Sequence, residues 1–340
     1  MMRVGSTLLA IVLAGVLAVL LASTWVAGDL LRFAHAPMKH GEAICFEVER
    51  GSTFGALLRR LEYDLGLGPF GPLRMQALAR LTGTAARLRA GEYRIEPGQT
   101  PSDWLAMLAQ GRAILYRVTL VEGMTLEQAR DVLVMHPALR PEGFALSGNE
   151  LMAVIGQPGK VAEGFFLPET YTFPRGTSDI EILRMANQAL RRELALLWEH
   201  RAPDLPLESP EQAVVLASIV EKETGKASER PRIAGVFVNR LRKGMRLQTD
   251  PTVIYGLGPA FDGNLSRRDL EADTPWNTYT RVGLPPTPIA LPSRDALAAA
   301  LHPEATDALY FVADGTGGHT FSSTLEGHNR AVRRYITRGR

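Results

Sequence analysis

The chain opens with an uninterrupted apolar segment. No charged residue occurs from Val4 to Gly28. As a helix rising 1.5 Å per residue, this run would be about 37 Å long and would cross the roughly 30 Å hydrocarbon core of a bilayer. A cleavable signal peptide, the alternative, has an apolar region of only about 7–15 residues. We expect a transmembrane anchor over residues 4–28, a cytoplasmic tail over 1–3 and an exported body, which places the protein in the inner membrane with its body in the periplasm.

After an expected linker over residues 29–41, one pattern occurs three times along the chain. A short β-prone run precedes Gly-x-Thr, and an amphipathic stretch follows it. The glycines and threonines concerned are Gly51, Gly98, Gly123, Thr53, Thr100 and Thr125. Glycine tolerates the positive φ of a tight turn, and a threonine hydroxyl can accept from the first free amides of a helix. The pattern predicts strand, turn and helix three times.

The first two of these units, with the apolar stretch Leu73–Leu81 between them, resemble the LysM-type βααβ modules that bind glycan chains. We assign residues 42–118 to this LysM-like subdomain. The resemblance implies a shallow glycan groove, for which the region offers the rings of Tyr63, Phe70, Tyr93 and Trp104. The alternative is that the region only packs on the catalytic body.

Two consecutive segments near the middle of the chain contain a candidate site residue and a predicted helix. Aromatic residues and prolines surround Glu169 in EGFFLPETYTFPRGTS, residues 163–178, which favours an irregular segment over a cleft. The stretch 180–200 follows with leucine and isoleucine at helical spacing. We expect that stretch to be a core helix and Glu169 to be a candidate ligand-binding side chain.

The segment from Ser209 to Thr224 is the most informative for chemistry. Ser209 and Gln212 have the spacing of a capping box, and a proline stands at the first helical position between them. Residues 213–220 are apolar on almost every side, which predicts a buried helix that ends at Glu221. Burial there would raise the pKa of the Glu221 carboxyl. Glu223 lies about 200° around the helix from Glu221, so the two cannot face each other as a pair.

Polar side chains gather in two later segments. One follows the predicted helix that ends at Gly244, and the other is the proline-rich and aromatic segment 274–303. With Glu169, they supply the candidate substrate-binding residues, which are Glu169, Gln248, Asp250, Tyr255, Asn277 and Tyr279.

Four sequence blocks then resemble one known family. They are LASIVEKET, VFVNRLRKGMRLQTDPTVIYGLG, PWNTYTRVGLPPTPI and HTFSSTLEGHN, in that order along the chain. They are similar to the signature blocks of the YceG-like family of membrane-anchored endolytic murein transglycosylases. Residues 290–293, ALPS, depart from the Asn-Pro that is common there and leave the local turn open.

The resemblance implies a reaction on peptidoglycan glycan strands. A single catalytic glutamate, which the match places at Glu221, would protonate the oxygen between N-acetylmuramic acid and N-acetylglucosamine. The same carboxylate would then remove a proton from the muramyl C6 hydroxyl, and a 1,6-anhydro end would form without water. Cleavage of nascent strands beside the membrane peptidoglycan synthases, as partners, is the setting that this reaction implies.

The expected architecture is α+β. It comprises the transmembrane helix, the small LysM-like βααβ subdomain and a larger mixed α/β catalytic domain over residues 119–338 with a buried catalytic helix. The 38 basic and 36 acidic residues give a net charge of +2, which argues against nucleic acid as a partner. The single cysteine, Cys45, excludes an internal disulfide framework. We expect no metal and no cofactor.

Three other functions stay open at this point. A muramidase would hydrolyse the same bond with Glu169 or Asp250 as a second carboxylate. A non-enzymatic scaffold would bind peptidoglycan through the Gly-x-Thr units, with Glu221 purely structural. A metal hydrolase would use His319 and His328, whose nine-residue separation is no recognised ligand spacing.

Overall fold

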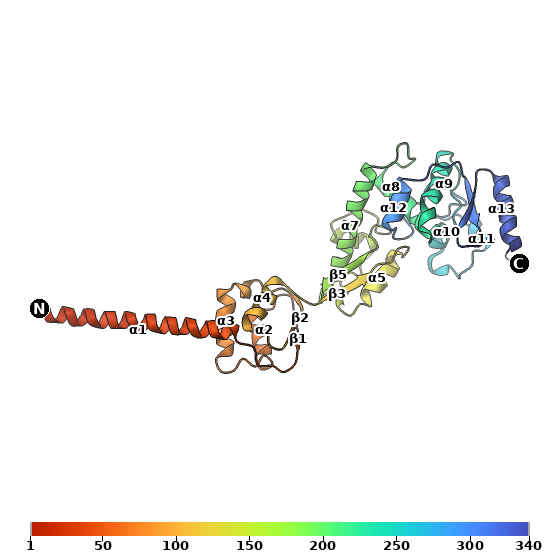
Figure 1. The fold of residues 1–340 in the computed structure, drawn as a ribbon. Coiled ribbons are helices and arrows are strands. Elements are labelled where there is room, and N and C mark those ends of the chain that lie inside the picture. Colours follow the sequence, from red (N-terminus) through yellow and green to blue (C-terminus); the bar gives the residue numbers. More distant parts are fainter. Residues whose placement is uncertain (1, 339–340) are drawn as a thin grey trace. The chain divides into compact units, whose positions relative to one another are not determined.

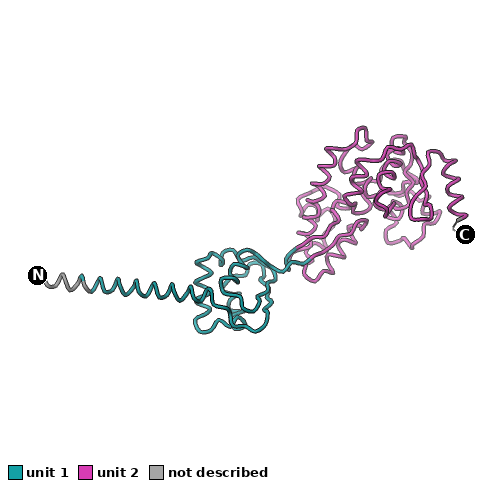
Figure 2. The backbone as a smooth tube through the Cα atoms, viewed as in Figure 1, with its two compact units in different colours: residues 1–116, 173–176 teal, residues 117–172, 177–340 magenta. Residues whose placement is uncertain are grey.

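The computed structural model describes residues 2–338, so Met1 of the predicted cytoplasmic tail lies outside the described residues. The chain divides into two compact units, shown in Figure 2. Unit 1 comprises Met1–Tyr116 with Phe173–Gly176, and unit 2 comprises Arg117–Thr172 with Thr177–Arg340. Helices and short strands alternate in a mixed α/β arrangement, and the strands of the described residues pair in the two-stranded orders β1–β2, β3–β5, β4–β6 and β7–β8.

Unit 1 begins with the long helix α1, Met2–His35 (Figure 1). The stretch Ile11–His35 is long and apolar enough to cross a membrane, with a mean hydropathy of 2.2, a property that a signal sequence shares. The helix continues through the first half of the segment that we expected to be a linker. Leu30 and Phe33 pack against the apolar core of unit 1, and this packing accounts for the longer helix.

The rest of unit 1 places two helices between paired strands and then adds a third. Its elements are β1 (Ile44–Val48), α2 (Phe54–Leu61), α3 (Gly71–Leu81), the 3-10 turn η1 (Thr84–Ala86), β2 (Gly91–Ile95) and α4 (Pro101–Gln110). Strand β1 pairs antiparallel with β2, with Ile44 opposite Ile95. The predicted N-caps are confirmed, because Thr53 accepts from the amide of Ala56 and Thr100 from that of Asp103, each at 3.2 Å.

The core of unit 1 contains two of the rings that we had considered for glycan binding. Tyr93 and Trp104 are both 0% exposed. Their rings lie within 6.1 Å of Phe46, and that of Trp104 also contacts Phe54. The expectation for these two residues is therefore corrected, since large apolar surface at these positions serves packing. Tyr63 and Phe70 are exposed.

Unit 2 is mostly helical. Strands β3 (Leu115–Thr119) and β5 (Thr170–Pro174) contain residues of both units. The remaining elements are α5 (Leu126–Val134), β4 (Leu139–Arg140), α6 (Gly148–Val154), β6 (Thr177–Ser178), α7 (Asp179–Glu199), α8 (Pro210–Glu223), η2 (Ala227–Glu229), α9 (Arg230–Arg242), α10 (Asp250–Leu257), η3 (Gly258–Ala260), α11 (Arg267–Glu271), α12 (Arg294–Leu301), β7 (Tyr310–Ala313), β8 (His319–Ser322) and α13 (Leu325–Arg338).

Helix α8 lies at the centre of unit 2. Helices α7, α9, α10 and α12 all contact it. Every residue from Ala213 to Glu221 is buried, as the apolar pattern predicts. The third Gly-x-Thr unit is confirmed as well, since Thr125 caps α5 by accepting from the amide of Gln128. The surrounding helices thus fix the end of α8, where the two glutamates lie.

Candidate active site

The start of α8 is capped by Ser209 as the sequence predicts, but Gln212 accepts from a different amide than expected. Ser209 Oγ accepts from the amide of Gln212 at 3.3 Å, and Pro210 occupies the first turn. In the expected capping box, Gln212 would accept from the amide of Ser209. Its Oε1 accepts instead from the amide of Glu208, at 2.8 Å. Both side chains therefore still bind backbone amides at the start of α8, and the helix ends at Glu223.

Glu221 is enclosed by hydrogen-bond donors from two neighbouring helices. Arg230 Nη2, at the start of α9, lies 2.8 Å from its Oε1. The amide of Ser293 donates to its Oε2 at 2.8 Å, and the Ser293 hydroxyl donates to the same oxygen. The Glu221 side chain is only 3% exposed. Both oxygens are occupied and hidden from solvent, so Glu221 joins α8, α9 and the N-cap of α12.

Glu223 has different surroundings. It is half-buried, and the hydroxyl of Thr249 donates to its Oε1. Burial raises the pKa of the Glu223 carboxyl to about 7; the bond from Thr249 opposes that shift, and the nearby Asp250 adds to it. His319 and Arg240 lie close enough to lower the value. A carboxyl with a pKa near 7 can both give and take a proton at neutral pH.

Three of the predicted substrate-binding residues lie with Glu223. Gln248 and Asp250 flank Thr249 and are exposed, and the hydroxyl of Tyr279 donates to Asp250 Oδ1 at 2.5 Å. The two segments are joined because the amides of Gln248 and Thr249 donate to the carbonyl and hydroxyl of Thr278, both at 3.1 Å. Burial raises the pKa of Tyr279 most, and Asp250 and Glu223 raise it further. The corner thus offers carboxyl, amide and phenol groups to a ligand.

The backbone at this corner is unusual. Gln248 has a φ of +50°, in the left-handed region that residues other than glycine seldom adopt. Arg240 anchors the turn, since its Nη1 donates to the carbonyl of Leu247 at 2.7 Å and lies 3.5 Å from Gln248 Oε1. Arg240 thereby holds Gln248 in the left-handed conformation, which a glutamine does not favour.

Asn277 does not face a ligand, which corrects its predicted role. It is 0% exposed. Its Nδ2 donates to the carbonyls of Asp269, Leu270 and Ala272, and its Oδ1 accepts from the amide of Tyr279 at 2.8 Å. These bonds use the polar groups of the side chain, so Asn277 organises the loop that carries Tyr279.

Glu169 and Tyr255, the remaining predicted residues, lie in other surroundings. Glu169 is exposed and forms an ion pair with Arg294, 3.0 Å away, next to the Ser293 cap that binds Glu221. The hydroxyl of Tyr255 donates to Glu163 Oε2 at 3.2 Å, and its ring meets that of Trp276 edge to face. Neither contact is with the Glu223 corner.

Glu163 is a functional candidate that the sequence reasoning missed. Its carboxylate accepts from the amides of Leu126 and Gly164 as well as from Tyr255. Burial raises the pKa of Glu163 to about 7, against the effect of these three donors. Three apolar residues, 165–167, follow it closely and are all buried. That apolar run was the signal for burial, and it favoured Glu163 over the exposed Glu169.

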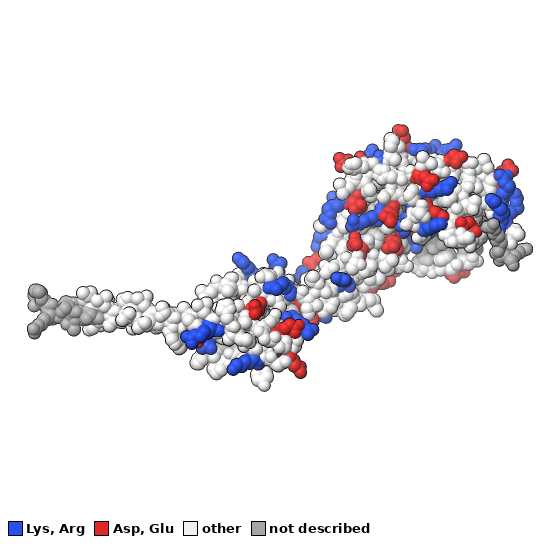
Figure 3. Space-filling view, in the orientation of Figure 1, with Lys and Arg blue, Asp and Glu red and all other residues white. Residues whose placement is uncertain are grey.

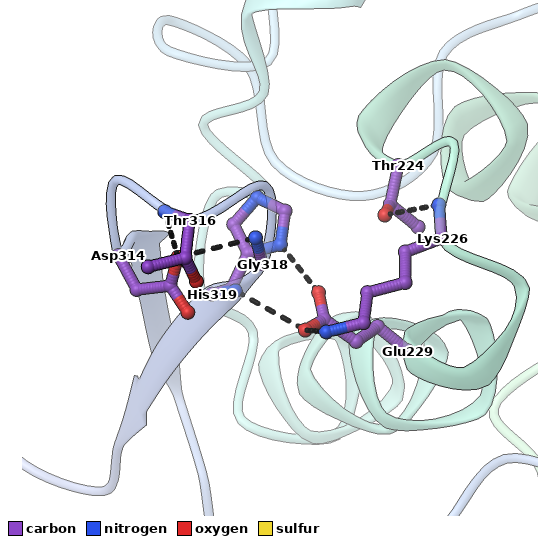
Figure 4. A network of polar contacts seen from close by, with 7 residues as sticks. All are labelled: Thr224, Lys226, Glu229, Asp314, Thr316, Gly318 and His319. Carbon is purple, nitrogen blue, oxygen red and sulfur yellow. Dashed lines mark hydrogen bonds and ion pairs between the residues drawn. The ribbon is translucent and has the colours of Figure 1, made fainter.

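A hairpin docks beside the end of α8, as Figure 4 shows. His319 of β8 holds Glu229 with its Nδ1 at 2.7 Å and its amide at 3.2 Å, and Lys226 lies 3.3 Å from the same carboxylate. Asp314 Oδ1 closes the hairpin turn by accepting from the amides of Thr316 and Gly318. These bonds fix His319 next to Glu223.

The two histidines that the metal-hydrolase alternative would use have different partners. His319 uses Nδ1 for Glu229, and the ring of His328 stacks on Tyr310 at 5.3 Å. Over residues 2–338, no three histidine, cysteine or acidic side chains are grouped as a metal site would require.

Comparison with known proteins places the chain in a family. The YceG-like family matches residues 46–334. An endolytic murein transglycosylase of Bacillus subtilis strain 168 is 38% identical over 180 residues, which cover 52% of this chain and 48% of that protein. A protein of the same name from Streptococcus pneumoniae R6 is 28% identical over 283 residues, covering 73% and 51%. The chain thus spans about half the length of the curated relatives that it matches.

A solved structure supports the same assignment. The 2.6 Å crystal structure of a YceG-like protein of Listeria monocytogenes superposes with a TM-score of 0.53 at 30% identity. The alignment covers 85% of this chain and 98% of that one. The family match includes the glutamates at the end of α8. The chain belongs to the YceG-like family.

Proposed function

We propose that this protein is an endolytic lytic transglycosylase that cuts the bond between N-acetylmuramic acid and N-acetylglucosamine in peptidoglycan strands. Family membership and the names of the curated relatives support this activity. Such cleavage would end the elongation of nascent strands and leave 1,6-anhydromuramyl ends. Glycan strands are the substrate, and membrane peptidoglycan synthases are the expected neighbours.

We assign the acid to Glu223 rather than to Glu221, the residue that the sequence predicts. The contacts of the two carboxyls carry this choice. Glu221 has both oxygens occupied and a side chain only 3% exposed, whereas Glu223 is half-buried with a pKa raised to about 7. A general acid must approach its substrate within hydrogen-bond reach. Only Glu223 combines a proton at neutral pH with access to the exposed Gln248 and Asp250.

The chemistry then needs one carboxyl. Protonated Glu223 gives its proton to the glycosidic oxygen as the bond from that oxygen to the muramyl C1 breaks. The resulting carboxylate takes the proton of the C6 hydroxyl, whose oxygen bonds to C1. Glu223 ends protonated, and no water is consumed. Asp250 would stabilise the positive charge that develops at C1, and Gln248 and Tyr279 would bind sugar hydroxyl and N-acetyl groups.

Hydrolysis is the competing reaction, because Asp250 supplies a second carboxylate beside Glu223. The two reactions differ in their products. We would digest purified sacculi with the full-length protein and weigh the released muropeptides. We expect muramyl ends that are lighter by one water than hydrolysed ends, and a full set of hydrolysed ends would instead identify a muramidase.

We also propose that α1 is an uncleaved single-pass anchor that holds the body in the periplasm.

We propose further that the LysM-like region binds glycan strands weakly and positions them. With Tyr93 and Trp104 in the core, Tyr63 and Phe70 remain as its candidate contact rings. Unit 1 has its own apolar core, which includes Ala34 and Met38, so the piece to test alone is residues 29–118. Titration with uncrosslinked strands should show weak binding; its absence at millimolar disaccharide would leave only a packing role.

A further inference from the structure

Helix α3 of unit 1 is apolar on two opposite sides. Met75, Leu78 and Ala79 face the core and are at most 8% exposed. On the other side, Leu73 and Leu81 are 66% and 76% exposed, and Phe70, just before the helix, is 73% exposed. Positions 73, 77 and 81 are four residues apart and share one helical face. Three large apolar side chains exposed on one side of a short helix point to a contact with something other than water.

The position of α3 along α1 indicates what that contact is. Arg74, in the first turn of α3, forms an ion pair with Asp29 of α1, with Nε and Oδ2 2.8 Å apart. Asp29 is the first charged residue after the apolar run that ends at Gly28. One turn further along α1, the ring of Phe33 lies beside Gly71. The Arg74 guanidinium is 5.7 Å from the centre of that Phe33 ring.

These contacts set the level of α3 relative to the apolar helix. In a bilayer, a helix leaves the hydrocarbon core near its first charged residues. Asp29 and Arg74 therefore mark the boundary between acyl chains and headgroups. Figure 3 shows α1 without coloured side chains between its grey end and the body of unit 1, where the first blue and red groups appear. The first turn of α3 lies at that transition.

We propose that the outer face of α3, formed by Phe70, Leu73 and Leu81, lies in the interfacial layer of the bilayer that α1 spans. The inference rests on the proposed role of α1 as an uncleaved anchor. Interfacial helices bury an apolar face several ångströms into the headgroup boundary, and basic side chains beside it reach anionic lipid. The exposed Arg80, between Leu73 and Leu81 on α3, fits that role.

Spin labels on the full-length protein in lipid nanodiscs test the proposal. The native Cys45, exposed on β1, carries the reference label. In a Cys45→Ser background, Leu73→Cys reports on α3 and Leu17→Cys on the middle of α1, and both replaced side chains are exposed. The readout is the ratio of accessibility to oxygen, which enters the bilayer, over accessibility to a water-soluble nickel chelate.

We expect the ratio at position 73 to exceed that at Cys45 by at least about fivefold, with a higher ratio still at position 17. A ratio at position 73 equal to that at Cys45, with position 17 in lipid, overturns the interfacial face and leaves the anchor intact. Water access at all three positions overturns the anchor and the inference together. Shielding at position 73 only when glycan strands are added identifies the face as a glycan surface instead.

Discussion

Glu223 stands two positions after Glu221, yet the partners of the two carboxyls come from different parts of the chain. Glu221 meets Arg230 and Ser293, nine and 72 residues away, whereas Glu223 meets Thr249, 26 residues away. The helical rotation between them sends one carboxyl toward α9 and α12 and the other toward the turn before α10. Charge compensation decides which one is structural, since a buried carboxylate persists where donors surround it.

The paired variants Glu223→Gln and Glu221→Gln separate these roles. We expect Glu223→Gln to remain folded and to lose strand cleavage by about 10³-fold or more, because a neutral amide cannot carry the proton. Glu221→Gln removes the nearer carboxylate of the buried Arg230 and leaves it the more distant Asp295, 3.5 Å away, so it should cost about 3 kcal/mol of stability, with cleavage per folded molecule within about tenfold of wild type. Muropeptide release and thermal unfolding measure both quantities. Equal loss of cleavage per folded molecule in the two variants would contradict the assignment.

The pH dependence gives a second test at this scale. The reaction starts from protonated Glu223, whose pKa is raised to about 7, so kcat/KM should be constant below pH 6 and fall as the pH rises through about 7. Glu163 has a pKa raised to the same region and supplies the control. We expect Glu163→Gln to keep the alkaline fall at the same pH. A fall that disappears in Glu163→Gln would transfer the titration to that residue.

At the scale of elements, the caps of α12 and α11 invite comparison. Ser293 caps α12 by accepting from the amide of Ala296, and it also donates to Glu221. Ser266 caps α11 in a capping box on an exposed part of the surface. The same residue type thus serves helix capping alone in one place, and capping together with a buried carboxylate in the other.

We therefore expect Ser293→Ala to destabilise the protein more than Ser266→Ala. The loss of a cap costs about 1 kcal/mol, and the loss of a donor to a buried carboxylate adds about 1–2 kcal/mol. Denaturant unfolding, followed by the fluorescence of tryptophans in unit 2, measures the difference. Equal effects of the two substitutions would mean that Glu221 does not depend on Ser293.

Elements governed by neighbours along the chain were predictable from the sequence. Thr53, Thr100 and Thr125 were identified as caps because the Gly-x-Thr pattern and the helix that follows are local. The buried helix α8 followed from its apolar run. The acid that we propose, Glu223, was not predictable, because the surroundings of Glu221 and Glu223 depend on residues distant in sequence. Asn277 was misplaced for the same reason, since its polarity is used by three carbonyls of its own loop.

At the scale of the whole molecule, the join between α1 and unit 1 governs how the chain can be shortened. Ala34 and Met38 are 3% and 6% exposed in the core of unit 1. Removal of residues 1–28 deletes the apolar run and spares these contacts. Removal of residues 1–40 deletes both core side chains as well as Asp29, the partner of Arg74.

We expect the chain lacking residues 1–28 to be soluble and still to cut isolated peptidoglycan, because α1 carries no group for the chemistry. The chain lacking residues 1–40 should lose about 2–5 kcal/mol of unit 1 stability from the emptied core positions. Digestion of sacculi and thermal unfolding of both proteins measure this. Inactivity of the folded shorter deletion would contradict the independence of the site from α1.

With α1 as the membrane anchor proposed above, its continuity with the core of unit 1 would also change the way in which the protein searches for glycan strands. A flexible tether would let unit 1 explore a volume above the membrane. An anchor helix that ends inside a packed core would act as a stiff joint and confine unit 1 to lateral diffusion and rotation in the plane of the lipid. Encounters of unit 1 with glycan then depend on the number of molecules per area of membrane. The rate of strand cutting in a cell would scale with that surface density rather than with the volume of the compartment.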